Sequence, residues 1–173
     1  MKSKIVIFLL LTCSIWFFSG CDNNEEYVPQ YPLNISVPLV YLNQQGIGST
    51  SYLSPNSSGY AVLTIPVANS ISQVYTLNDE LDPNFKGLLI YKAAINIYII
   101  YDRTCTYLPL TNNCALEPVE EWENLFKCPC CQSEFLLKES GSTIFEGPAH
   151  RHLLVYSNSI VDLNLGYLFI QNY

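Results

Sequence analysis

Short segments of alternating apolar and polar residues recur along this chain of 173 residues from position 33 onward. A period of two places successive side chains on opposite faces of an extended strand, so such segments form sheets that bury one face. Each segment is long enough for one strand and too short for a stable helix. We expect strands at residues 35–42, 60–65, 87–92, 95–101, 124–128, 134–138, 142–146, 153–157 and 166–172.

Turn-forming residues separate these segments. The stretches SPNSSG, LDPNFKG, ESGS and FEGPA are rich in Gly, Pro, Asn and Ser and lie between expected strands. Only residues 78–83 suggest a helical turn. Many short strands joined by such turns are typical of an all-β sandwich or barrel-like domain, and we place one domain at residues 33–173.

The N-terminus has the organisation of an export signal. Two lysines precede an apolar stretch at residues 5–18, and small residues then lead to Cys21. The stretch is shorter than the roughly 20 residues that a membrane-spanning helix needs. Cys21 resembles the lipidated cysteine of a bacterial lipoprotein. We therefore expect a signal peptide at 1–20 and a lipid anchor at Cys21, in preference to an ordinary signal or an uncleaved anchor.

Residues 21–32 are polar and acidic, carry two prolines, and are expected to form a tether between the lipid and the domain. Their acidic residues also resemble the surface-export signals of some Bacteroidetes lipoproteins. The localisation that follows is a membrane of the bacterial cell envelope, on its periplasmic or cell-surface face.

The charge of the mature chain limits its partners. Loss of the signal leaves 6 of the 8 basic residues against 15 acidic ones, a formal net charge of −9. Nucleic acid is excluded as a partner because its affinity comes largely from Lys and Arg on phosphates. Adsorption to anionic headgroups is excluded for the same reason, which leaves the lipid as the membrane contact.

Five cysteines lie between the expected strands in the second half of the chain. In an exported protein, loop cysteines form disulfides by default, but an odd number leaves one thiol over. A C-x-x-C pair within this set also suits a metal ion. A redox-active pair is disfavoured because a proline follows its first cysteine and strands flank it. The cysteines are Cys105, Cys114, Cys128, Cys130 and Cys131.

The order of motifs resembles a Rieske iron–sulfur domain. YDRTCTY at 101–107 is followed by CPCCQSEF at 128–135, by GSTIFEGPAHRHLLVY at 141–156 and by a closing LFIQN. The resemblance covers roughly residues 87–172. It implies antiparallel sheets that carry a small cysteine-rich subdomain at about 102–150.

That family binds a [2Fe-2S] cluster through Cys-x-His and Cys-x-x-His motifs on two loops. By resemblance, Cys105 and Cys128 match the thiolate ligands. Tyr107 and Cys131 stand where the two histidines are expected, so this chain is a divergent member that lacks both ligand histidines. Tyr107 would have to ionise to bind a metal, against an ordinary pKa near 10.

Three interpretations of the site remain open. Disulfides can replace the cluster, with Cys105 joined to Cys128 and, by resemblance, Cys130 joined to Cys114. Alternatively, Cys105, Cys128 and Cys131 hold zinc or a cluster together with Cys114 or Cys130. The third is a Rieske-like [2Fe-2S] electron carrier. The signal lacks an arginine pair, which favours export before folding and hence a site without a cytoplasmic cluster.

His150 and His152 follow the Gly-Pro-Ala loop at positions i and i+2. On a strand both imidazoles would point the same way and could assist a metal site. Two half-exposed surface histidines are the favoured alternative.

No pattern of catalytic residues accompanies these motifs. A Gly-x-Ser-x-Gly nucleophile elbow is absent, and the acidic cluster around Trp122 suits a solvated loop or a partner contact. We expect a non-enzymatic lipoprotein module with no bound cofactor or with zinc. Its cysteine-rich tip would present Tyr107, Trp122 and the histidines to a protein partner. The alternative function is electron transfer by a [2Fe-2S] cluster.

Overall fold

The computed structural model describes residues 26–55, 60–65, 73–80, 82 and 84–172. The expected signal, the lipidated Cys21 and the first part of the tether lie outside these residues. Within them the chain is mainly antiparallel strand, which confirms the all-β class. No helix in the described part of the chain is long and apolar enough to span a membrane.

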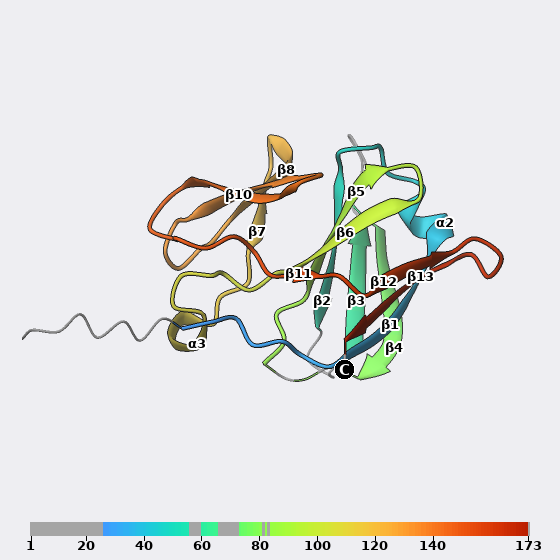
Figure 1. Cartoon of the computed structure of the whole chain (residues 1–173), viewed down its shortest axis with the longest axis horizontal. Coiled ribbons are helices and arrows are strands. Elements are labelled where there is room, and N and C mark those ends of the chain that lie inside the picture. Colours follow the sequence, from blue (N-terminus) through green and yellow to red (C-terminus); the bar gives the residue numbers. More distant parts are fainter. Residues whose placement is uncertain (1–25, 56–59, 66–72, 81, 83, 173) are drawn as a thin grey trace, which may run out of the picture.

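A six-stranded antiparallel sheet forms the middle of the structure (Figure 1). Its strands are β2 (Thr50–Pro55), β3 (Tyr60–Ile65), β4 (Gln73–Glu80), β5 (Leu88–Ala94), β6 (Ile97–Asp102) and β11 (Val155–Tyr156). Their order across the sheet is β11-β6-β5-β2-β3-β4. In this order β5 and β6 are neighbours inside the sheet, with Ile90 opposite Ile100.

Strand β5 is buried on both faces, and this determines how the layers stack. Leu88 and Ile90 pack into one hydrophobic core. Leu89 and Tyr91, which point the opposite way, pack into a second core. The sequence of a strand that is buried on both faces is a continuous apolar run, as in LLIY at residues 88–91.

A three-stranded sheet covers one face of the central sheet. It consists of β1 (Leu33–Pro38), β12 (Ser159–Asp162) and β13 (Tyr167–Asn172) in the order β1-β13-β12. Ile35, Val37, Leu168 and Ile170 are at most 1% exposed and belong to the first core. The two ends of the described chain therefore pair with each other and close this layer.

A four-stranded sheet contributes to the second core. It consists of β7 (Glu117–Val119), β8 (Trp122–Lys127), β9 (Glu134–Lys138) and β10 (Gly141–Glu146) in the order β10-β9-β8-β7. Phe126, Phe135 and Leu137 pack with Leu89 of the central sheet, and Tyr101 donates a hydrogen bond to the Lys138 carbonyl at 2.8 Å. This sheet lies within residues 102–150, which the sequence assigned to the cysteine-rich subdomain. In Figure 1 it stands to the left of the central sheet.

The expected strands at 60–65 and 134–138 coincide with β3 and β9. The expectation for 35–42 is wrong in its second half, because β1 ends at Pro38 and a helical turn, α2 (Leu39–Leu42), follows. Proline has no N–H for the strand ladder, and the N–H of Leu39 instead donates to the Gly166 carbonyl at 2.8 Å.

The helical turn expected at 78–83 is also wrong, because residues 78–80 belong to β4 and Glu80 pairs with Tyr60. Sequence patterns missed β2, whose buried face is partly polar. Thr50 and Ser51 are at most 1% exposed, and the Ser51 hydroxyl donates to the Gln45 side chain at 2.8 Å. This bond satisfies the buried Ser51 hydroxyl, whereas the buried Thr50 hydroxyl has no hydrogen-bond partner among the described residues, and hydropathy alone would place both residues at the surface.

The segment before β1 packs against the domain. Tyr31 is only 9% exposed, its ring meets that of Phe85 edge to face at 5.6 Å, and its carbonyl accepts a hydrogen bond from Asn172 at 2.8 Å. The folded structure therefore starts before Leu33, where the sequence placed the domain boundary.

Asp102 joins the end of β6 to β11 and to the first cysteine loop. Its side chain is fully buried, one oxygen accepts the Thr104 N–H at 2.7 Å, and the other accepts the Tyr156 hydroxyl at 2.7 Å. Burial raises the pKa of Asp102, against the opposing effect of the hydrogen bonds from Thr104 and Tyr156.

The raised pKa of Asp102 predicts a pH-dependent stability. The folded protein holds this proton more tightly than the unfolded chain, whose aspartate pKa is about 3.9. The stabilising contribution is complete below that value and is lost as the pH rises through the folded pKa. We expect the free energy of unfolding of D102N to fall less with pH than that of the wild type, in urea titrations from pH 4 upward. Equal slopes would contradict a raised pKa.

Gly87, just before β5, is predicted to tolerate no side chain. Its φ is +109°, and a Cβ atom there would lie 1.9 Å from the Leu53 carbonyl oxygen. We expect G87A to lower the free energy of unfolding by about 3 kcal/mol or more, measured by urea denaturation. G48A is the control, because Gly48 has φ +89° and no atom within 4 Å of its Cβ position. It should lose only the backbone term of about 1–2 kcal/mol.

Candidate metal centre

Three loops that connect the layers carry the candidate residues. The first, residues 103–116, connects β6 to β7, and the second, residues 128–133, connects β8 to β9. The third, residues 147–154, leads from β10 back to β11. The sequence placed the five cysteines on loops, and the structure confirms that all five lie outside the strands.

Backbone pairing closes the first loop at its base. Thr104 and Ala115 form an isolated antiparallel bridge, and the Cys105 N–H donates to the Cys114 carbonyl at 2.9 Å. Beyond this base the chain makes one helical turn, α3 (Pro109–Asn112). The pairing places Cys105 and Cys114 side by side although they are nine positions apart in the sequence.

The N-terminal segment fastens the outer part of the first loop. The Glu26 carboxylate accepts the backbone N–H groups of Leu110 and Thr111 at 2.9 and 3.0 Å, and the Thr111 hydroxyl donates to it as well. The hydrogen bonds from Thr111 lower the pKa of Glu26. Sequence analysis placed Glu26 in the tether, and no local pattern signals a contact between residues 84 positions apart.

The second loop is a tight turn whose backbone returns on itself. The Cys128 N–H donates to the Ser133 carbonyl at 2.8 Å, and the Gln132 N–H donates to the Cys128 carbonyl at 2.9 Å. Gln132 has φ +64°, in the left-handed region that favours glycine. Its side-chain amide donates to the Pro129 carbonyl at 2.9 Å, a local bond that helps to hold this conformation.

A disulfide between Cys114 and Cys130 joins the first loop to the second. Their Cα atoms are 6.4 Å apart, within the range of protein disulfides. This is the bridge that the family resemblance implied. The direct bond between Cys105 and Cys128, one of the sequence-based alternatives, is not formed, because both are free thiols.

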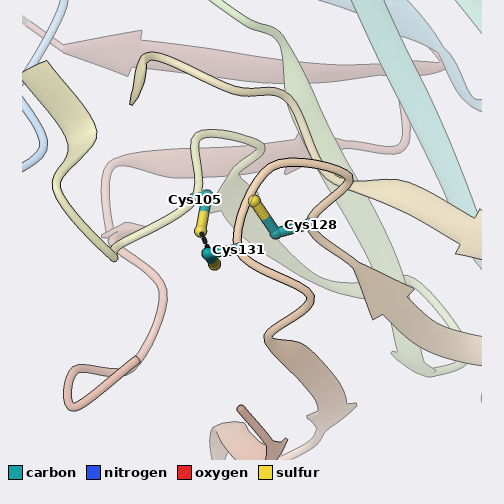
Figure 2. Close-up of side chains that lie close together, drawn as sticks. All are labelled: Cys105, Cys128 and Cys131. Atoms are coloured by element: carbon teal, nitrogen blue, oxygen red, sulfur yellow. Dashed lines mark hydrogen bonds between the residues drawn. The ribbon is translucent and has the colours of Figure 1, made fainter. Parts of the chain in front are cut away.

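Cys105, Cys128 and Cys131 converge on one point, and we call them the cysteine triad. Their three sulfur atoms all lie within 4.8 Å of one another, and the sulfur atoms of Cys105 and Cys131 are 3.5 Å apart. Cys105 and Cys128 are fully buried, whereas Cys131 is half-buried. Figure 2 shows the three side chains approaching each other from two different loops.

Ser133 contacts the triad through Cys131. Its side chain is fully buried, its Oγ lies 3.1 Å from the Cys131 sulfur, and the same oxygen accepts the Ala149 N–H at 3.0 Å. Gly147 lets the third loop approach this serine, since a Cβ there would lie 2.4 Å from the Ser133 Cα. The third loop therefore fixes the position of Ser133, and with it the environment of Cys131.

The environment acts in opposite directions on two thiols of the triad. Burial raises the pKa of Cys105 well above its usual range, because its thiolate would be poorly solvated. Burial also acts to raise the pKa of Cys131, but hydrogen bonds from the Ser133 hydroxyl and backbone outweigh it, and the pKa is lowered. In the described part of the molecule, the more accessible thiol of the triad is thus also the more acidic of these two.

Neither histidine joins the triad, whereas Tyr107 lies beside it, where its backbone N–H bonds the Cys105 sulfur. His150 and His152 are exposed and lie in the third loop outside any strand, as expected for surface histidines. Among the described residues, the cluster of possible metal ligands at this point contains the three cysteines and neither histidine. Tyr107 is half-buried and packs against the second core, and its carbonyl accepts a hydrogen bond from Asn112 at 3.4 Å.

These donors do not fit a Rieske-type cluster, which needs two imidazoles on its second iron. An all-thiolate cluster needs a fourth thiolate, and the two other described cysteines are joined in a disulfide. A single soft metal ion fits better. Sulfur atoms bound at about 2.3 Å to one tetrahedral zinc ion lie about 3.8 Å apart. The sulfur atoms of Cys105 and Cys131 are 3.5 Å apart and all three lie within 4.8 Å of one another, so zinc requires a shift of about 1 Å or less.

Comparison with known proteins identifies no relative: no family model matches the chain, and none of the curated proteins matches it.

The inter-loop disulfide is predicted to stabilise the fold without belonging to the triad. It closes a loop of 16 residues, for which chain entropy gives roughly 3 kcal/mol. We expect the double variant C114S/C130S to lose about that amount in urea denaturation. The wild type should lose a similar amount when a reductant is added, whereas the double variant should not respond. An unchanged unfolding midpoint in the double variant would contradict the prediction.

Proposed function

We propose that this chain is a lipid-anchored, non-enzymatic protein of the bacterial cell envelope whose cysteine triad binds a single thiophilic metal ion. Zinc is the first candidate. The observation that carries the proposal is the convergence of three free thiols within 4.8 Å. In an exported protein such thiols would otherwise tend to form disulfides, as Cys114 and Cys130 do.

The surroundings of the triad support a metal ion. Two of the three thiols are fully buried in the second core, so any ion between them is largely shielded from water. Cys131 lies nearer the surface and leaves one side accessible. Thiolates select zinc, monovalent copper or iron–sulfur clusters over hard cations such as magnesium. Zinc can bind after export. A cluster assembled in the cytoplasm would have to be exported inside an already folded protein.

The resemblance to Rieske domains supports the proposal at a coarser level. An all-β domain that carries two cysteine loops and a Gly-Pro-Ala loop is the arrangement the resemblance implied. We infer that the loops descend from a cluster-binding ancestor and that Cys131, in place of a histidine, turned the site into a thiolate site. The competing function is a [2Fe-2S] electron carrier, and the metal content distinguishes the two.

A partner surface on the cysteine-rich subdomain is part of the proposal. Trp122 and Phe145 are 50% and 56% exposed, and their ring centroids lie 6.3 Å apart. The exposed Glu120 and Glu121 form the turn next to Trp122. Exposed aromatic pairs are enriched at protein interfaces, and acidic residues at the rim would favour a basic partner.

The first test is the metal content of the lipidated protein isolated from an exporting host without added thiols or chelators. We expect one zinc ion per chain and no absorption in the visible region. C105S, C128S and C131S should each reduce zinc occupancy at least tenfold, because two thiolates hold zinc far more weakly than three. Two iron atoms per chain with visible bands would favour the cluster instead.

The double variant C114S/C130S is the matched control. It removes two sulfur atoms, against one in each triad variant, and leaves the triad intact. It should retain one zinc ion per chain. Loss of zinc in this variant as well as in the triad variants would place the metal elsewhere, or make the disulfide essential to the site.

A further inference from the structure

The three sulfur atoms of the triad differ in their access to solvent and in their distances. Cys131 is half-buried, whereas Cys105 and Cys128 have no exposed surface. The Cys131 sulfur lies 3.5 Å from that of Cys105. Cys131 is therefore the one cysteine of the triad with exposed surface, and its sulfur is in contact with that of Cys105.

We propose that Cys131 is a covalent modification site for external disulfides and that Cys105 resolves the adduct. The sulfur of Cys131 is the one that a dissolved disulfide can reach. The mixed disulfide formed there is then displaced from within the protein, and the product is a Cys105–Cys131 bond. The proposal depends on the described geometry of the free thiols and adds a redox property to the proposed metal site.

The reaction balances with the external disulfide as oxidant. The Cys131 thiolate attacks one sulfur of that molecule, forms a mixed disulfide and releases the first external thiolate. The Cys105 thiol then attacks the Cys131 sulfur, the bond to the external sulfur breaks, and the Cys105 proton passes to the second external thiolate as it leaves. Two protein thiols have lost two electrons, and one external disulfide has become two thiols.

Cys105 is favoured over Cys128 as the resolving thiol by position. Its sulfur is in contact with that of Cys131. Cys128 shares the tight second loop with Cys131, and the Gln132 N–H bonded to the Cys128 carbonyl holds that turn closed. Cys105 comes from the opposite loop, so the new bond would run between the loops, parallel to the existing Cys114–Cys130 bridge. Oxidation would then leave the two loops joined twice.

The consequence for the site rests on the proposed function. A Cys105–Cys131 disulfide removes two of the three thiolates, and Cys128 alone cannot hold the ion. Metal binding and this oxidation therefore exclude each other. The bound ion protects the thiols while they are its ligands, and an oxidising environment converts the metal-free protein into a form that must be reduced before it is loaded.

The test exposes the full lipidated chain, stripped of metal, to oxidised glutathione at pH 8 and counts the reduced glutathione released per chain. We expect two equivalents from the wild type and two from C128S. C105S should release one and keep glutathione on Cys131, and C131S should release none. Peptide mapping of the wild type should find Cys105 joined to Cys131 with the Cys114–Cys130 bond retained, and an unchanged circular dichroism spectrum should show that each variant is folded.

Other patterns would overturn the proposal. Two equivalents from C105S and one from C128S would assign the resolving role to Cys128. Release from C131S would show that entry is not at Cys131. A stable single adduct on the wild type would show that no resolving thiol is in reach. Because these counts use metal-free protein, they remain decisive if the chain binds no zinc, in which case the proposed function fails while the modification site stands.

On zinc-loaded protein, the same reagent should release one zinc ion for every two equivalents of reduced glutathione, followed with a coloured chelator. Zinc release without formation of the Cys105–Cys131 bond would contradict the mutual exclusion of the two states.

Discussion

Burial of β5 on both faces is the constraint from which the other features follow. The alternation of Leu88 and Ile90 with Leu89 and Tyr91 places side chains in two separate cores. One core is built with the sheet of the two chain ends and the other with the cysteine-rich sheet. The first cysteine loop leaves directly from β6, and the bridge between Thr104 and Ala115 closes its base. Asp102, with both oxygens bonded, fixes the point of departure.

The cysteine triad combines residues whose positions are set by different kinds of restraint. Cys105 follows a buried strand and a backbone bridge, whereas Cys128 and Cys131 belong to a turn that closes on itself. The Cys114–Cys130 bond holds the two supports together. Each cysteine of this region therefore has an assigned place, and the odd number that left the sequence ambiguous divides into one bridge and one set of three.

Much of this could be predicted from the sequence, and the misses have physical reasons. Alternating segments such as 60–65 and 134–138 identified strands because one face of each meets a core. Strand β2 was missed because buried Thr50 and Ser51 read as polar until their environment is known. The division of the cysteines depends on which loops meet across the fold. Spacing along the chain does not contain that information, and only the resemblance pointed to the Cys114–Cys130 pair.

The contact of Glu26 with the first cysteine loop has a consequence for how the molecule sits on a surface. Four residues separate Cys21 from Glu26, and the five Cα–Cα steps between these two residues reach at most about 18 Å. The proposed lipid on Cys21 would therefore attach the domain to the membrane beside α3. If the proposed lipid is present, the cysteine-rich side of the domain would stay within this short reach of the membrane.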